Sequence, residues 1–242
     1  MYIKRVAISN YRNFRDFHVE LKQFSIVIGE NDVGKTNFLE ALKLPLYAND
    51  FSFSRKVLKI TDINTDVLKE FIDTFKEKKD EIVGALSDGS SLDFIIENIP
   101  IIKVEVAFSD AKNSYERAML KNFITEVDDE VCYVICYEFA PRRPIQVIEF
   151  MITMLDENEE VSENLFPIDL YDYRVYSAQN EKRIVNKNLS MFKVSTISAD
   201  RDDFSESDNR KSNKMVSDLL HRNLSNSDKS SIHNAYKIFL IQ

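Results

Sequence analysis

The chain has 242 residues, of which 44% are hydrophobic, and a formal net charge of -8. This apolar content is enough for a buried core and argues against an intrinsically disordered protein, while the acidic balance argues against a surface that binds nucleic acid everywhere. The longest apolar runs fall far short of the roughly 20 residues that span a bilayer, and the first residues lack the apolar stretch of a secretion signal. We therefore expect a folded cytoplasmic protein with no membrane partner.

The cysteines and histidines do not indicate a metal or redox site. Cys132 and Cys136 are the only cysteines, and on an extended strand they would lie about 13 Å apart, too far for a disulfide. The three histidines are scattered, whereas a zinc site needs four ligands at defined spacings. We expect the cysteines to be core residues and the histidines (His18, His221 and His233) to have ordinary surface or core roles.

The first third of the chain changes from strand-like to helix-like periodicity. Apolar and polar residues alternate over residues 2–8 and 17–21, which predicts a hairpin-like pair of strands. The apolar run 24–28 is typical of a strand buried on both faces, and we expect it to be central in the sheet. From Lys35 the apolar spacing is helical, and Pro45 should bend or end that helix.

The later elements follow from the same patterns. Residues 61–87 have apolar positions at three- and four-residue intervals, which predicts one amphipathic helix. We expect strands at 101–108, 131–139 and 146–155, a short helix around 115–124, and tail helices at 215–220 and 232–240. The strands should form an antiparallel run, and the uncapped apolar end of the tail should pack against another element.

Residues 29–36 carry the chemistry. Their sequence, Gly-Glu-Asn-Asp-Val-Gly-Lys-Thr, fits the phosphate-loop pattern of two glycines separated by four residues and followed by lysine and serine or threonine. The glycines allow backbone N–H groups to curl around a phosphate, and the N-terminus of the following helix adds partial positive charge. Lys35 should reach the β- and γ-phosphates, and the Thr36 hydroxyl should bind Mg²⁺. The motif predicts binding of ATP with Mg²⁺.

The residues around this loop also carry a resemblance. Residues 3–14 and 26–41 resemble the N-terminus of the ATPase head shared by recombination-type and structural-maintenance ABC ATPases, and most of all the OLD family of ATP-dependent nucleases, including the Gabija-type defence nucleases. The resemblance implies an α/β fold, a P-loop ABC-type ATPase half-head with a mixed or antiparallel sheet and flanking helices. It also implies dimerisation and, in longer members, an endonuclease domain that acts on DNA in antiviral defence.

The resemblance assigns roles residue by residue. Arg12 matches an arginine that lies near the nucleotide in this superfamily, with a surface arginine in a turn as an equal alternative. A glutamine that senses magnesium and the γ-phosphate is expected downstream, and Gln146 and Gln179 both remain candidates. The implied nucleotide-binding residues are Gly29, Glu30, Asn31, Asp32, Val33, Gly34, Lys35, Thr36, Asn37 and Arg12, with Thr36 as the magnesium ligand.

Two motifs of an ABC-type site are missing from the chain. Such a site also needs a Ser-Gly-Gly signature and an apolar strand that ends in Asp-Glu. No glycine follows Gly89, and the apolar run 131–137 continues into Glu138, Phe and Ala. A nuclease module is missing too. We therefore assign hydrolysis to a larger parent ATPase and leave open whether this chain is an enzyme; if it turns over ATP, Glu138 is the first carboxylate to test.

These observations predict how the chain is organised. We expect residues 1–242 to be the N-terminal part of one ABC-type ATPase domain. Its segments should be a phosphate-loop lobe at 1–50, a helical insertion at 51–98, antiparallel strands at 99–200 and a helical tail at 201–242. The partner of this part should be a second copy of the chain or the missing half of the head.

Two functions from different classes remain open. The first is the ATP-binding part of an ATPase that controls a DNA-processing or anti-phage defence nuclease. The alternative is a self-standing regulatory or decoy module that binds nucleotide without turnover. A small P-loop kinase is a weaker third reading, because such kinases continue with parallel strand–helix units, whereas this chain continues with an antiparallel pattern.

Overall fold

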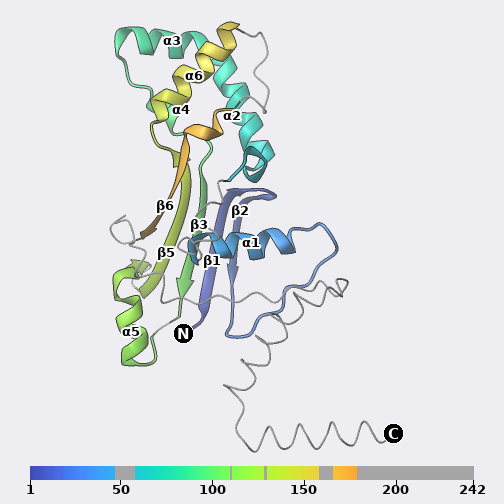
Figure 1. Ribbon diagram of the computed structural model, residues 1–242, viewed down its shortest axis with the longest axis vertical. Coiled ribbons are helices and arrows are strands. Elements are labelled where there is room, and N and C mark those ends of the chain that lie inside the picture. Colours follow the sequence, from blue (N-terminus) through green and yellow to red (C-terminus); the bar gives the residue numbers. More distant parts are fainter. Residues whose placement is uncertain (47–57, 110, 128–129, 158–165, 179–242) are drawn as a thin grey trace, which may run out of the picture. The chain divides into compact units, whose positions relative to one another are not determined.

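The computed structural model describes residues 1–46, 58–109, 111–127, 130–157 and 166–178 (Figure 1). The chain divides into two units, Met1–Val194 and Ser195–Gln242, and only the first contains described residues. The predicted tail helices and Gln179 lie outside the described residues. No helix in the described part is long and apolar enough to cross a membrane.

An antiparallel sheet of six strands is the framework of the first unit. Its strand order is β2-β1-β3-β5-β4, and β6 also pairs with β5. The strands predicted near the N-terminus and at 101–108 and 131–139 are confirmed, whereas β4 and β6 were not predicted. The bounds are β1 (Ile3–Tyr11), β2 (Phe14–Glu20), β3 (Ile102–Phe108), β4 (Ile124–Val127), β5 (Glu130–Pro141) and β6 (Tyr171–Ser177).

Helix α1 (Lys35–Leu46) packs across one face of this sheet (Figure 1). Alternation along the strands turns every second side chain toward the helix, since successive residues of a strand point to opposite faces. Pro45 lies inside the helix, and the residues that follow Leu46 lie outside the described part of the chain. The buried residues that meet in this layer are Val6, Ile8, Val104 and Val106 from the sheet and Phe38, Ala41 and Leu44 from the helix.

The helical segment after α1 has a break that was not predicted. The pattern at 61–87 predicts one helix, but the chain forms η1 (Ile60–Asp62), α2 (Thr65–Glu77) and α3 (Lys79–Asp88). The apolar periodicity continues through the break at Lys78, so it cannot reveal the change of direction. Figure 1 shows α2, α3, α4 (Asp93–Ile96) and α6 gathered at one end of the sheet.

The prediction of a strand at 146–155 is wrong, because these residues form helix α6 (Pro144–Glu157). Pro144 occupies the first helical position, where its missing N–H is not needed. Val147, Ile148 and Met151 are buried at helical spacing, but the run is so apolar that strand and helix patterns both fit it. An ion pair of 2.7 Å between Lys79 and Asp156 joins α3 to α6.

The prediction of a central strand at 24–28 is also wrong. These residues belong to no strand, and Phe24 and Ile28 are 80% and 87% exposed. An apolar run can form a buried strand only where neighbouring strands supply hydrogen bonds on both sides. Among the described strands, the edge of the sheet on this side is β2, which pairs only with β1.

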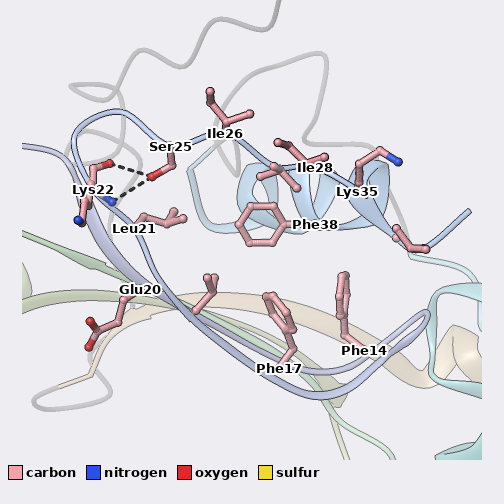
Figure 2. Close-up of a pocket in the computed structure, with 14 residues that line it drawn as sticks. Phe14, Phe17, Glu20, Leu21, Lys22, Ser25, Ile26, Ile28, Lys35 and Phe38 are labelled. Atoms are coloured by element: carbon pink, nitrogen blue, oxygen red, sulfur yellow. Dashed lines mark hydrogen bonds between the residues drawn. The ribbon is translucent and has the colours of Figure 1, made fainter. Parts of the chain in front are cut away.

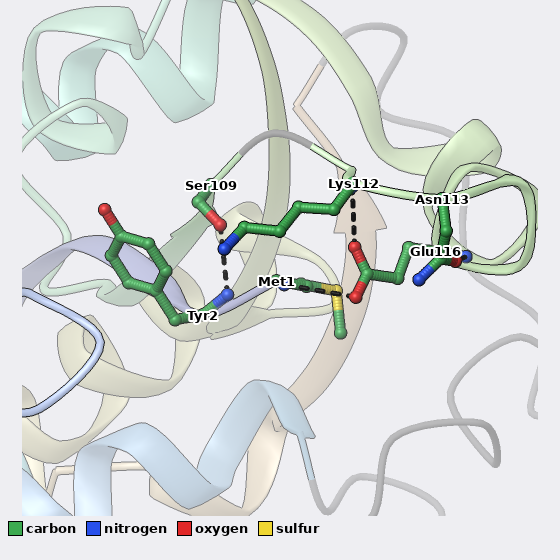
Figure 3. Close-up of polar contacts among 6 residues, drawn as sticks. All are labelled: Met1, Tyr2, Ser109, Lys112, Asn113 and Glu116. Atoms are coloured by element: carbon green, nitrogen blue, oxygen red, sulfur yellow. Dashed lines mark hydrogen bonds and ion pairs between the residues drawn. The ribbon is translucent and has the colours of Figure 1, made fainter.

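The start of β1 is held by the short helix α5 (Ser114–Leu120), which continues into η2 (Lys121–Phe123) and was predicted as a short helical pattern. Glu116 accepts hydrogen bonds from the backbone N–H of Lys112 (2.7 Å) and from the N-terminal ammonium of Met1 (3.2 Å) (Figure 3). These two bonds favour the carboxylate and hold the pKa of Glu116 below its usual range.

The opposite face of the sheet carries a smaller apolar cluster. Cys136 lies in it with Ala107, Val134 and Tyr176. Burial, followed by the nearby Glu105 carboxylate, raises the pKa of the Cys136 thiol to about 12. Such a thiol is neutral and unreactive at physiological pH, which agrees with the expectation that Cys136 is a core residue.

Two buried tyrosines lead to opposite predictions for the loss of a hydroxyl. Tyr171, at the start of β6 after η4 (Ile168–Leu170), donates its buried hydroxyl to the Pro100 carbonyl at 3.0 Å, whereas the Tyr11 hydroxyl has no hydrogen-bond partner in the described part of the chain. We expect Tyr171→Phe to lower the free energy of unfolding by about 1 kcal/mol and Tyr11→Phe to leave it unchanged or raise it. Urea unfolding of both variants checks this, and equal losses would contradict it.

Candidate functional site

The loop that precedes α1 has the backbone conformation that its glycines predict. Gly34 has φ of +101°, and a Cβ on it would lie 2.3 Å from Asn13 Nδ2. A Cβ on Gly29 would lie 2.8 Å from Val33 Cγ2. Asp32 also has a positive φ, of 66°. The two glycines therefore allow a tight curl that larger residues would open.

Lys35 closes this curl from the first turn of α1. Its Nζ donates hydrogen bonds to the carbonyl oxygens of Gly29, at 2.7 Å, and Glu30. An ammonium group has three N–H donors, so these bonds leave one for a ligand. The positive charge of Lys35 is thereby held next to the start of the loop, at Gly29 and Glu30.

A depression of about 270 Å³ lies at the mouth of the loop. Thr36 is exposed and lines the depression, and the helix begins with the bond from Phe38 N to the Gly34 carbonyl at 2.8 Å. The N–H groups before Phe38 have no carbonyl of their own helix to bond, so they can bind an anion. The residues that line the depression are Asn31, Asp32, Gly34, Lys35, Thr36 and Asn37.

Arg12 lies beside the loop, and its guanidinium forms hydrogen bonds with two other side chains. Its Nη1 donates to Asn37 Oδ1 at 2.9 Å, and its Nε donates to Asp62 Oδ1 at 2.8 Å. Asn13, the next residue, accepts a hydrogen bond from Asn37 Nδ2 at 2.7 Å. The turn between β1 and β2 thus contacts the first turn of α1.

An apolar groove of about 540 Å³ adjoins the loop on its other side (Figure 2). Phe14 and Phe17 form its floor on β2, and Phe38 reaches it from α1. The rings of Phe17 and Phe38 meet edge to face with centroids 5.9 Å apart. Val33 also lines the groove.

Two residues considered from the sequence lie away from the loop. Gln146 is exposed on α6 and lines neither the depression nor the groove. Glu138 shares its sheet face with Cys136, opposite the face that α1 covers, where it accepts hydrogen bonds from Arg174 Nε at 2.7 Å and the Tyr176 hydroxyl at 3.0 Å. The structure therefore gives neither of them a place at the phosphate loop.

Three residues at the site were not predicted. Asn13 donates to the Val33 carbonyl at 3.3 Å, Asp62 pairs with Arg12, and Asn64 donates to the Arg12 carbonyl at 2.7 Å. The pattern Asn-Tyr-Arg-Asn offered a weak signal for Asn13, since asparagine is typical of turns. Asp62 and Asn64 are distant in sequence and offered none.

Comparison with known proteins identifies the family. A family model described as an AAA ATPase domain matches residues 1–239. The chain belongs to the AAA ATPase domain family. This family implies a nucleotide with a metal ion as ligand, and the curled loop, the lysine at its mouth and the exposed Thr36, a residue type that binds Mg²⁺, fit such a ligand.

Individual relatives are matched over shorter stretches. The DNA replication and repair protein RecF of Clostridium perfringens is 32% identical over 107 residues, which are 43% of this chain and 29% of RecF. An uncharacterised protein of Mycobacterium tuberculosis is 35% identical over 74 residues, 30% of this chain and 8% of that protein. The endonuclease GajA of Bacillus cereus is 41% identical over 46 residues, 19% of this chain and 8% of GajA.

These matches span less than a third of each relative. Together with the family they support the ABC-type ATPase superfamily that the sequence resembles. They do not single out the OLD family.

Proposed function

We propose that this AAA ATPase family member binds ATP and ADP with Mg²⁺ at the depression in front of α1. The observation that carries the proposal is the curl at Gly34, after which Lys35, Thr36 and Asn37 of the first turn of α1 all line the depression. Lys35 would contact the β- and γ-phosphates, and Thr36 would bind Mg²⁺. Residues 29–34 would surround the phosphates, and Asn37 and Arg12 would border them.

We further propose that the chain serves as the nucleotide-binding part of an ATPase that controls a DNA-processing nuclease. The similarity to proteins named RecF and GajA supports a DNA-related role, and the resemblance at residues 3–14 and 26–41 supports an OLD-type nuclease of antiviral defence. A second copy of the chain or further parts of the same ATPase would complete the nucleotide site.

A regulatory or decoy module that binds nucleotide without turnover is the second candidate. The observation in its favour is that Glu138 is occupied by Arg174 and Tyr176 on the far face of the sheet. Strand β5 passes from Tyr137 through Glu138 into Phe139 and does not present there the Asp-Glu pair that would orient water. The two candidates share the same nucleotide site and differ in hydrolysis.

Calorimetric titration of the full 242-residue chain with ADP and ATP tests binding. We expect binding that requires Mg²⁺ and is weak, because an open half-site buries one side of the nucleotide. We expect no phosphate release, since loss of one charge-stabilising element can slow turnover by about 10³-fold or more. Absence of binding would refute the site, and ATP hydrolysis that depends on Lys35 would refute the second candidate.

A further inference from the structure

The Arg12 side chain joins the phosphate loop to the helical segment that follows residue 58. Its guanidinium contacts Asn37 in α1 and Asp62 in η1 through two different nitrogens. The side chains of Arg12 and Asp62 are only 26% and 9% exposed. Such a shielded pair is screened less by water and salt than a surface pair.

The backbone around Arg12 is held in an uncommon conformation by the same segment. Asn10 and Arg12 have φ of 58° and 48°, which is rare for a residue with a side chain such as arginine. The Arg12 N–H donates to the Asp62 carbonyl at 2.8 Å, and Asn64 N donates to the Asn10 carbonyl at 2.9 Å. The turn therefore depends on residues 62–64 for its shape.

Hydrogen bonds continue from this turn in both directions. Toward the loop, Asn37 Nδ2 donates to Asn13 Oδ1, and Asn13 Nδ2 donates to the Val33 carbonyl. Toward the helical segment, Asn64 donates to the Arg12 carbonyl and accepts from Val67 N at 3.2 Å, which caps α2. One chain of bonds thus runs from the phosphate loop to the N-terminus of α2.

We propose that Asp62 is a positioning residue that couples the phosphate loop to α2 through Arg12. The inference rests on the proposed binding of Mg²⁺-nucleotide at the loop. Asp62 holds the guanidinium in the orientation that fixes Asn37. Asn37 in turn fixes Asn13, whose amide donates to the carbonyl of Val33. Nucleotide that orders the loop in turn strengthens the attachment of α2, because coupling between two sites is reciprocal.

The substitution Asp62→Asn removes the charge with little change in shape. One of its side-chain oxygens becomes an amide that faces the Lys59 N–H, which now donates to Asp62 Oδ2 at 2.9 Å. We expect this variant to bind Mg²⁺-ADP about tenfold more weakly than the wild type, within the range typical of coupling between sites. Calorimetry measures the dissociation constant, and thermal unfolding of the free protein reports stability separately.

Glu70→Gln is the matched control. Arg15 and Glu70 also join the β1–β2 hairpin to the helical segment, through a two-bonded pair at 2.6 and 2.7 Å, but they are 58% and 57% exposed and line neither the depression nor the groove at the loop. We expect Glu70→Gln to bind Mg²⁺-ADP within twofold of the wild type. If Asp62→Asn behaves like Glu70→Gln while the wild type binds, the coupling is overturned and the proposed function stands.

Hydrogen exchange distinguishes positioning from a merely structural role. Saturating Mg²⁺-ADP should slow exchange of the amides of α2 (Thr65–Glu77) in the wild type and leave them unchanged in Asp62→Asn. Arg12→Lys is the substitute variant if Asp62→Asn does not fold, because a lysine ammonium lacks the planar guanidinium that bridges Asp62 and Asn37. We expect Arg12→Lys to weaken binding of Mg²⁺-ADP about as much as Asp62→Asn. Wild-type affinity in Arg12→Lys would overturn the coupling. A wild type that binds no Mg²⁺-ADP removes both the proposed function and this inference.

Discussion

Replacing Lys35 by alanine should abolish detectable binding of Mg²⁺-ATP and Mg²⁺-ADP. The ammonium contributes charge-assisted hydrogen bonds, each worth about 1.5–3 kcal/mol, or roughly 10- to 150-fold in affinity. It also donates to the carbonyls of Gly29 and Glu30, so its loss leaves the loop without the group that closes it. The two losses act together on a site that is expected to be weak. Calorimetry on the variant measures the result.

Lys22→Ala is the appropriate control for the loss of a positive charge. Lys22 lines the apolar groove next to the loop (Figure 2), and the two hydrogen bonds described for it, both with Ser25 Oγ, involve its backbone N–H and carbonyl. We expect affinity for nucleotide to change little in this variant. Equal weakening by Lys22→Ala and Lys35→Ala would show that general charge, and not the loop geometry, attracts the nucleotide.

Gly34→Ala should weaken nucleotide binding by about 10- to 100-fold. The φ of +101° costs an alanine roughly 1–3 kcal/mol, and the added Cβ would meet the Asn13 amide at 2.3 Å. Relief of both strains requires the loop to open and the amides at the start of α1 to turn away from the phosphate position. Titration with Mg²⁺-ADP, alongside thermal unfolding, separates this local effect from loss of the fold.

Gly84→Ala provides the contrast within the same chain. Gly84 lies in α3, and a Cβ on it would meet nothing within 4 Å. Alanine there should raise the free energy of unfolding by up to about 1 kcal/mol, since glycine is a poor helix former, and should leave nucleotide affinity unchanged. Weaker binding in this variant, or unchanged binding in Gly34→Ala, would contradict the role given to the loop.

The sequence predicted the elements whose signals are local. Strands β1 and β3 and helix α1 each bury one face, so the spacing of their apolar residues was sufficient to predict them. Helix α6 was mispredicted because its apolar run fits a strand and a helix equally. The segment 24–28 was mispredicted because an apolar run does not report whether neighbouring strands are present to pair with it. In both cases the outcome depends on neighbours, such as α3 for α6, which periodicity does not report.

The same distinction applies to the candidate site. The glycines, Lys35 and Thr36 form a motif of defined spacing, so the sequence alone suffices to predict them as nucleotide-binding residues. Asp62 and Asn64 both contact Arg12, in the turn beside the loop. Arg12 and Asp62 are 50 residues apart in the sequence. The side chains of Asp62 and Asn64 are of ordinary types for a helix start, so only the folded arrangement reveals their contacts.

The exposed apolar segment in front of the loop also affects how the protein behaves at high concentration. The stretch Phe-Ser-Ile-Val-Ile-Gly at 24–29 is rich in β-branched residues and has no charge, which is the composition of segments that stack between chains as amyloid-like strands. Lys22 and Glu30 flank it. In a parallel, in-register stack each Lys22 would lie next to the Lys22 of the neighbouring chain, and each Glu30 next to a Glu30, so the repulsion between like charges would oppose stacking. Because salt screens such repulsion, we infer that the tendency to aggregate increases with ionic strength and that nucleotide bound at the adjoining loop counteracts it.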